Sequence, residues 1–171
     1  PVHAPRALMV PHAGYVFSGK VAASAYNQLL PGIIPQRVFI LASSHFHHFP
    51  GVSVFCSGNY ETPLGPVDVD IETGRKLLDD NLLFSNHEEV HTNEHSLEVQ
   101  LPFLQYKLGR QLKIVPLILG SQQPEESLKL ADSLRPYFTS DNLFVISSDL
   151  SHYPCYEDAI KADRATSESI L

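Results

Sequence analysis

The chain has 171 residues, 43% of them hydrophobic and 18% charged, which suits a single folded domain with a substantial core. Its formal net charge is −7 and it has no basic block, so we expect no nucleic-acid partner. No apolar run approaches the roughly 20 residues of a membrane-spanning helix, so we expect no membrane partner either. The two cysteines, Cys56 and Cys155, form no C-x-x-C pair, which favours a reduced, cytoplasmic protein over a disulfide framework.

Apolar runs of strand length alternate with helical patterns along the chain. The predicted strands cover residues 7–10, 37–42, 52–56, 114–119 and 143–147, and the predicted helices cover 18–30, 71–80, 94–108, 124–138 and 157–171. Ser18 and Asp70 are suited to cap the first two helices, and Pro102 predicts a kink or a late start in the third. The alternation predicts an α/β fold with a mostly parallel sheet flanked by helices.

The C-terminal stretch ATSESIL continues a helical pattern without a cap, a glycine or a proline. We therefore expect residues 1–171 to form one domain that is incomplete at its C-terminus, with further sheet beyond Leu171.

Polar residues follow three of the predicted strands directly. His12 follows the first strand, Ser44 and His45 follow the second, and Asp149 and His152 follow the last. Because open parallel sheets bind ligands at the carboxyl ends of their strands, these side chains are expected to gather in one crevice. A lone loop histidine is usually solvated or hydrogen-bonded, but the three histidines together favour a functional site.

The chemistry of these side chains suits a metal. Neutral imidazole binds Fe(II), Cu, Zn or Ni, and two histidines leave coordination positions open for a substrate or for oxygen. The residues therefore favour a divalent metal site among His12, His45 and His152. The remaining histidines are expected at the loop surface or beside the site (His47, His48) and in exposed loops (His3, His87, His91).

Asp149 and His152 could act together in proton transfer. A carboxylate orients an imidazole and raises its basicity, while the imidazole shuttles protons. The alternative is that Asp149 caps a helical turn, and the two interpretations are compatible.

The stretch TNEHSLEVQLPF is a second candidate cluster. Glu94 and Glu98 are one helical turn apart with His95 beside them, which predicts that His95 and Glu98 line the site. The alternative is a solvated helix start, in which acidic residues are favoured by the helix dipole.

The sequence PHAGY suggests how His12 is presented. Gly14 is expected to let the backbone turn sharply, so that His12 enters the crevice while Tyr15 closes over it. Tyr15 then either offers its phenol to a ligand or only packs, and Ser44 is a further candidate for substrate binding.

Five motifs resemble those of a known family: PHAGYVFSGKVAASAY, FILASSHFHH, YETPLGPVDVD, EHSLEVQLPFLQ and LFVISSDLSHY. Their order and span are similar to the Memo family, also known as the AmmeMemoRadiSam system protein B group. The resemblance implies a fold like that of the LigB-type class III extradiol dioxygenases, which are non-haem Fe(II) enzymes. It implies metal ligation by His12 and His45, active-site roles for Asp149 and His152, and an acid–base role for His152 or His95. It also implies a third ligand, a cysteine, beyond residue 171.

Three functions stay open at this point. The residues fit a metal-dependent oxidoreductase of the dioxygenase kind, a non-catalytic module that binds a small molecule or a peptide, or a zinc-dependent hydrolase. Fe(II) or Cu is the favoured metal, with Zn as the alternative. Members of the family that the chain resembles include redox proteins and phosphotyrosine-peptide adaptors. Microbial members are associated with radical SAM and AMMECR1-like proteins, so the resemblance implies such partner proteins here.

Overall fold

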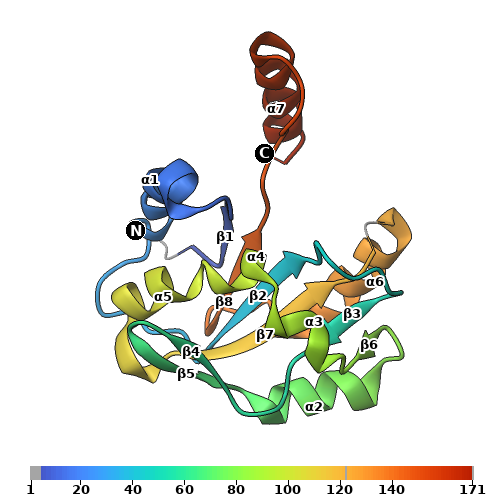
Figure 1. The fold of residues 1–171 in the computed structure, drawn as a ribbon. Coiled ribbons are helices and arrows are strands. Elements are labelled where there is room, and N and C mark those ends of the chain that lie inside the picture. The colour runs from blue at the N-terminus through green and yellow to red at the C-terminus, as the bar shows by residue number, and fades with distance from the viewer. Residues whose placement is uncertain (1–4, 122, 171) are drawn as a thin grey trace.

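A computed structural model describes residues 5–121 and 123–170, which form an α/β structure around one sheet of eight strands (Figure 1). The strands run in the order β1-β8-β2-β7-β3-β6, and a hairpin of β4 and β5 joins the sheet through β7. Their bounds are β1 Ala7–Val10, β2 Arg37–Ser43, β3 Val52–Val54, β4 Asn59–Thr62, β5 Gly65–Val69, β6 Phe84–Ser85, β7 Lys113–Leu119 and β8 Asn142–Ser147.

The centre of the sheet is parallel, and this places the ends of its strands together. β1, β8, β2 and β7 pair in parallel, with Ser147 of β8 opposite both Val10 of β1 and Ala42 of β2. The segments that follow β1, β2 and β8 therefore leave the sheet at the same edge. β3 runs antiparallel to β7 and parallel to β6, which makes the sheet mixed at that side.

Helices cover both faces of the sheet, as parallel strands with apolar side chains on both faces require. One face packs against α1 (Tyr15–Tyr26), α4 (His95–Glu98) and α5 (Leu101–Leu108), and α3 (Glu88–Thr92) contributes Val90 to the same core. The other face packs against α2 (Ile71–Asp80) and α6 (Pro124–Leu134). Short 3-10 turns, η1 (Gly109–Gln111) and η2 (Arg135–Tyr137), follow α5 and α6, and α7 (Tyr156–Ile170) ends the described chain.

The fold is the predicted one: a mostly parallel sheet flanked by helices. The caps were predicted less well than the elements. Asp70 caps α2, because its carboxylate accepts a hydrogen bond from the Thr73 backbone N–H at 3.0 Å. The prediction for Ser18 was wrong, since α1 begins at Tyr15 and the Ser18 hydroxyl donates to the carbonyl of Ala13 at 2.7 Å.

The helix predicted over residues 94–108 is two helices. α4 ends at Glu98 and α5 begins at Leu101, with Pro102 in its first turn, where its missing N–H breaks no hydrogen bond. The late start that Pro102 predicts is therefore confirmed for α5, and residues His95–Glu98 form a separate short helix.

The role predicted for Gly14 was also wrong. Gly14 has φ −52° and ψ 149°, which any residue can adopt, and a Cβ there would meet only ordinary contact with Phe17 at 3.8 Å. The backbone at this point does not depend on the freedom of glycine.

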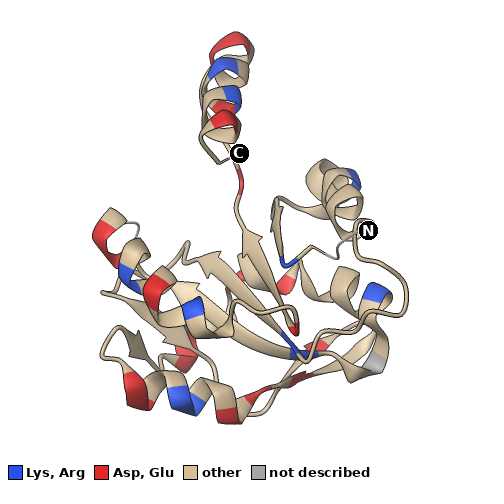
Figure 2. Ribbon diagram, turned by 180° about the vertical axis from the view of Figure 1, so that it is seen from behind, with Lys and Arg blue, Asp and Glu red and all other residues tan. Residues whose placement is uncertain are grey.

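α7 stands away from the sheet in Figure 1, and none of its residues is buried. Acidic and basic residues interleave along α7 and α2 (Figure 2), with ion pairs such as Arg164–Glu168 and Lys76–Glu72. Among the described residues, no helix combines the length and apolar character needed to cross a membrane. Cys56 and Cys155 are both free thiols.

Candidate metal centre

His12 lies two residues after β1, with only 6% of its side chain exposed. Asp149 fixes the backbone here, because its Oδ1 accepts hydrogen bonds from the N–H groups of His12 at 2.6 Å and Ala13 at 3.3 Å. The ring nitrogen Nδ1 of His12 lies 3.1 Å from the Ser147 hydroxyl. Burial lowers the pKa of His12 and outweighs the opposing effect of Asp149, so the ring is neutral at neutral pH, as a metal ligand must be.

His45 follows β2 and is held by Glu94. The Glu94 carboxylate accepts hydrogen bonds from the His45 backbone N–H at 2.6 Å and from its ring Nδ1 at 2.8 Å. It also accepts from the Ser96 N–H at 3.1 Å, which caps α4. Burial alone would raise the pKa of Glu94, but the hydrogen bonds from His45 and Ser96 outweigh it and lower that pKa. Glu94 is therefore a buried anion that orients the His45 ring.

α4 brings a third imidazole, that of His95, to the same place. The Ser96 hydroxyl donates to the Ser43 carbonyl at 2.9 Å, which ties α4 to the end of β2. The centroid of the His95 ring then lies 4.8 Å from that of His45 and 5.9 Å from that of His12, while His12 and His45 are 5.2 Å apart. Three imidazoles from separate segments of the chain thus meet at the predicted edge of the sheet.

Potential ligand atoms of His45, Glu94 and His95 lie within 4.8 Å of one another, a spacing that could hold a metal ion. Both oxygens of Glu94 are already engaged by His45, and its side chain is 1% exposed against 39% for His45 and 48% for His95. We therefore assign Glu94 to orienting the imidazole, and the accessible donors of this cluster are nitrogens.

Asp149 and His152 form the pair that their spacing suggests. His152 Nε2 lies 3.2 Å from Asp149 Oδ2, and its Nδ1 lies 2.8 Å from the carbonyl of Leu150. The same Oδ2 faces His12 Nε2 at 3.6 Å. Asp149 does not cap a helix here, because its Oδ1 serves the backbone of His12 instead. The carboxylate is shared between a buried imidazole and an exposed one.

The residues predicted to bind substrate are less closely grouped. Tyr15 donates its phenol hydrogen to the Val99 carbonyl at 3.1 Å, and together with Glu98 it lines a cavity of about 390 Å³. Ser44 accepts a hydrogen bond from the His47 N–H at 3.1 Å, so its hydroxyl shapes the turn that carries His45.

One histidine was placed wrongly. His91 was predicted in an exposed loop, but it is buried in α3, between the Tyr60 hydroxyl at 2.9 Å from its Nδ1 and the Ser53 hydroxyl at 3.1 Å from its Nε2. The segment 86–93 lacks an apolar stripe, so no helix could be predicted there. His47 and His48 are exposed, His87 is half-buried, and His3 lies outside the described residues.

Three residues support the site in roles that were not predicted: Glu94 holds His45, and Gln100 and Ser147 lie behind His12. The available signal was a glutamine inside the apolar run LEVQLPF, since a buried amide must find hydrogen-bond partners.

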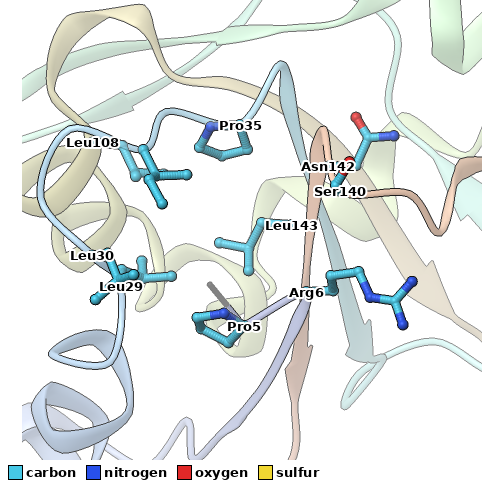
Figure 3. Close-up of a pocket in the computed structure, with 10 residues that line it drawn as sticks. Pro5, Arg6, Leu29, Leu30, Pro35, Leu108, Ser140, Asn142 and Leu143 are labelled. Carbon is cyan, nitrogen blue, oxygen red and sulfur yellow. The ribbon is translucent and has the colours of Figure 1, made fainter. Parts of the chain in front are cut away.

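A larger cavity, of about 580 Å³, lies at the opposite edge of the sheet (Figure 3). Pro35, two residues before β2, and Asn142, the first residue of β8, line it together with Arg6, Leu29 and Leu143. In a parallel sheet the ligand crevice lies at the carboxyl ends of the strands, so the histidine cluster is the better candidate site.

The profile of a family described as "Memo-like protein" matches residues 1–171. A "MEMO1 family protein" of Sulfurisphaera tokodaii is 39% identical over 95% of this chain and 59% of its own length. A protein of the same description from Sulfolobus acidocaldarius is 38% identical over 99% of this chain and 61% of its own length. The chain thus spans about three-fifths of the length of these relatives.

One solved structure, "uncharacterized protein JW3007 from Escherichia coli K12", shares the fold with a TM-score of 0.57 at 16% identity. The match covers 86% of this chain and 61% of that one.

Proposed function

The chain belongs to the Memo family, and on this basis we propose that it is a non-haem metal-binding protein with redox activity of the dioxygenase kind. In this proposal His12 and His45 hold a divalent cation, Fe(II) or Cu in preference to Zn. The observation that carries it is the meeting of the imidazoles of His12, His45 and His95 at the carboxyl edge of the sheet.

The donor set fits such a cation. Imidazole nitrogen suits Fe(II), Cu and Zn alike. A histidine that binds a metal almost always donates its other ring N–H to a carboxylate or a carbonyl, and Glu94 provides that carboxylate for His45. Once Glu94 holds the Nδ1 proton, the Nε2 lone pair of His45 is available. A bound Fe(II) or Cu would supply electron transfer toward a substrate or dioxygen.

Proton handling falls to Asp149 and His152. The His152 side chain is 53% exposed, so it can exchange protons with solvent while its Nε2 contacts Asp149. Asp149 reaches both His152 and the neighbourhood of His12, and so connects solvent to the site. His95, also half-exposed, is a second candidate acid–base group next to His45.

The substrate side of the proposal involves Tyr15 and Glu98. Both line the cavity beside α4, the short helix that also carries His95. A small molecule or a peptide bound there would contact Glu98, three residues after His95 on α4. The activity and the partners of the whole protein are part of the same proposal, because this chain spans only three-fifths of its relatives.

Metal content provides the test. The chain would be loaded anaerobically with Fe(II), Cu or Zn, freed of excess metal and analysed by elemental mass spectrometry. We expect the wild-type chain to retain metal and the double variant His12→Ala/His45→Ala to lose it. The control is His47→Ala/His48→Ala, which removes two exposed imidazoles from the same loop and should retain the metal.

Equal metal content in the wild-type chain and the His12→Ala/His45→Ala variant would contradict the site. If the wild-type chain retains metal and the double variant does not, oxygen consumption with a catechol tests the redox activity of the loaded protein. Retention of metal without any oxygen consumption would contradict the dioxygenase-like part of the proposal and leave the binding site in place.

A further inference from the structure

A chain of buried hydrogen bonds leads from the core to the ring of His12. The Tyr26 hydroxyl lies 2.8 Å from Oε1 of Gln100, and Nε2 of Gln100 lies 2.9 Å from the Ser147 hydroxyl. That hydroxyl lies 3.1 Å from Nδ1 of His12. All four side chains are buried, so no solvent competes for these contacts.

The amide of Gln100 has only one orientation that its surroundings allow. Its Nε2 also lies 3.1 Å from the carbonyl oxygen of Pro11, which can only accept a hydrogen bond. The reversed amide would place two carbonyl oxygens against each other and leave the Pro11 acceptor unpaired. Gln100 therefore donates one amide hydrogen to Pro11 and the other to Ser147.

The single proton of the Ser147 hydroxyl is also assigned. Its Oγ lies 2.5 Å from the carbonyl oxygen of Ser96, and two oxygens approach so closely only with a hydrogen between them. Ser147 must be the donor, because the carbonyl has no proton to give. The two lone pairs of the hydroxyl then face Gln100 and His12, so Nδ1 of His12 has to be the donor in its contact.

We propose that Gln100 and Ser147 are positioning residues that hold the neutral His12 ring as the Nδ1–H tautomer and leave the Nε2 lone pair free for a metal. The competing tautomer would direct an Nε2 proton toward Asp149 Oδ2, which at 3.6 Å is beyond normal hydrogen-bond length. His12 and His45 thus present the same tautomer through different partners. A carboxylate accepts the Nδ1 proton of His45, and a hydroxyl oriented by the Ser96 carbonyl and the Gln100 amide accepts that of His12. The tautomer follows from contacts alone, and only its purpose rests on the proposed function.

The test reads the tautomer directly, in the metal-free full chain. Long-range ¹H–¹⁵N spectra at neutral pH distinguish imidazoles protonated at Nδ1 from those protonated at Nε2. We expect the Nδ1–H pattern for His12 in the wild-type chain. Ser147→Ala removes the acceptor and should convert His12 largely to the Nε2–H form. Gln100→Met keeps the side-chain length but removes the amide donor, so only the Ser96 carbonyl still orients the Ser147 hydroxyl, and the Nδ1–H share of His12 should fall less than in Ser147→Ala.

Tyr26→Phe is the matched control. It removes a hydrogen bond from the same chain but leaves Pro11 to orient Gln100, so the His12 tautomer should not change even if stability falls. Zn(II) titration should show a loss of affinity of about 10- to 100-fold in Ser147→Ala and little change in Tyr26→Phe. A merely structural role would instead affect all three variants in proportion to their loss of stability.

An Nε2–H pattern in the wild-type chain, or an unchanged tautomer in both Ser147→Ala and Gln100→Met, would overturn the proposal. The proposed function fails separately, if the wild-type chain binds no Zn(II), Fe(II) or Cu at all. In that case the spectra still decide whether Gln100 and Ser147 set the tautomer of His12.

Discussion

At the scale of single residues, the candidate site depends on side chains that never face its ligand. Glu94 is the clearest example, because three hydrogen bonds from His45 and Ser96 converge on its carboxylate. From sequence, Glu94 looked like one of several acids at the start of a helix. Its burial arises because the short helix α4 turns its N-terminus toward β2, a tertiary arrangement that no local pattern encodes.

Replacement of Glu94 by Gln tests this role. The neutral amide offers a single acceptor oxygen where the carboxylate offers two, so the His45 backbone or ring loses its partner. We expect a loss of about 1–3 kcal/mol in the free energy of unfolding. Metal affinity should fall about 10- to 100-fold. Urea unfolding and metal titration measure these effects, with Glu89→Gln, an exposed residue of α3, as the control. Equal affinity in both variants would count against an orienting carboxylate.

His91 makes the folding stability depend on pH. Burial lowers its pKa from 6.5 to about 4 in the folded protein, despite the opposing hydrogen bond with Ser53. Between these values the unfolded chain binds the proton and the folded chain does not, so the stability from His91 is complete above pH 6.5. It falls as the pH decreases toward 4, by a total on the order of 3 kcal/mol.

The variant His91→Gln removes this titration. Urea unfolding between pH 7 and pH 5 should therefore show a smaller loss of stability in His91→Gln than in the wild-type chain. His12, whose pKa is also lowered, contributes in the same direction to both and cancels in the comparison. His47→Gln, which alters an exposed ring, should follow the wild-type curve, and parallel curves for all three proteins would refute the assignment.

At the scale of elements, the strands were predictable and the way α4 meets α5 was not. Runs such as Val38–Ile40 are apolar at every position, which is typical of strands covered on both faces, and the structure confirms them. The break after Glu98 leaves Gln100 free to point at Pro11 and Ser147. Only the proline at position 102 hinted at it. The two-residue strand β6 and the helix α3 are too short to produce a period in the sequence.

The connection between β2 and β3 depends on Gly51. Its φ of +77° lies in the left-handed region, and a Cβ there would collide with the backbone carbonyl of Leu83. We expect Gly51→Ala to lower the free energy of unfolding by about 3–5 kcal/mol, since strain and a backbone clash add together. Gly32→Ala is the control, because Gly32 has φ +82° with open space around it and should lose only about 1–2 kcal/mol. Equal losses in urea unfolding would show that the clash is relieved without cost.

At the scale of the whole molecule, topology decides which residues share the site. His12, His45 and Asp149 follow three different strands, and they meet because these strands are parallel neighbours in the order β1-β8-β2. This much follows from the sequence, once an alternating α/β pattern is recognised. The detailed chemistry does not follow, because the partners of each imidazole come from α4, from the α4–α5 junction and from the end of β8.

α7 provides a prediction at the same scale. It projects from the sheet with no buried residue, and an isolated helix of 15 residues is marginal in water. In the 171-residue chain, the backbone amides of α7 should therefore exchange with deuterium far faster than those of α5, whose Leu101 and Leu104 are fully buried. Hydrogen exchange followed by mass spectrometry measures both helices in one sample. Trypsin should likewise cut at Lys161 and Arg164 before it cuts within the sheet, because a protease needs a segment that unfolds locally. Protection of α7 equal to that of α5 would mean that α7 packs against the rest of the chain in solution.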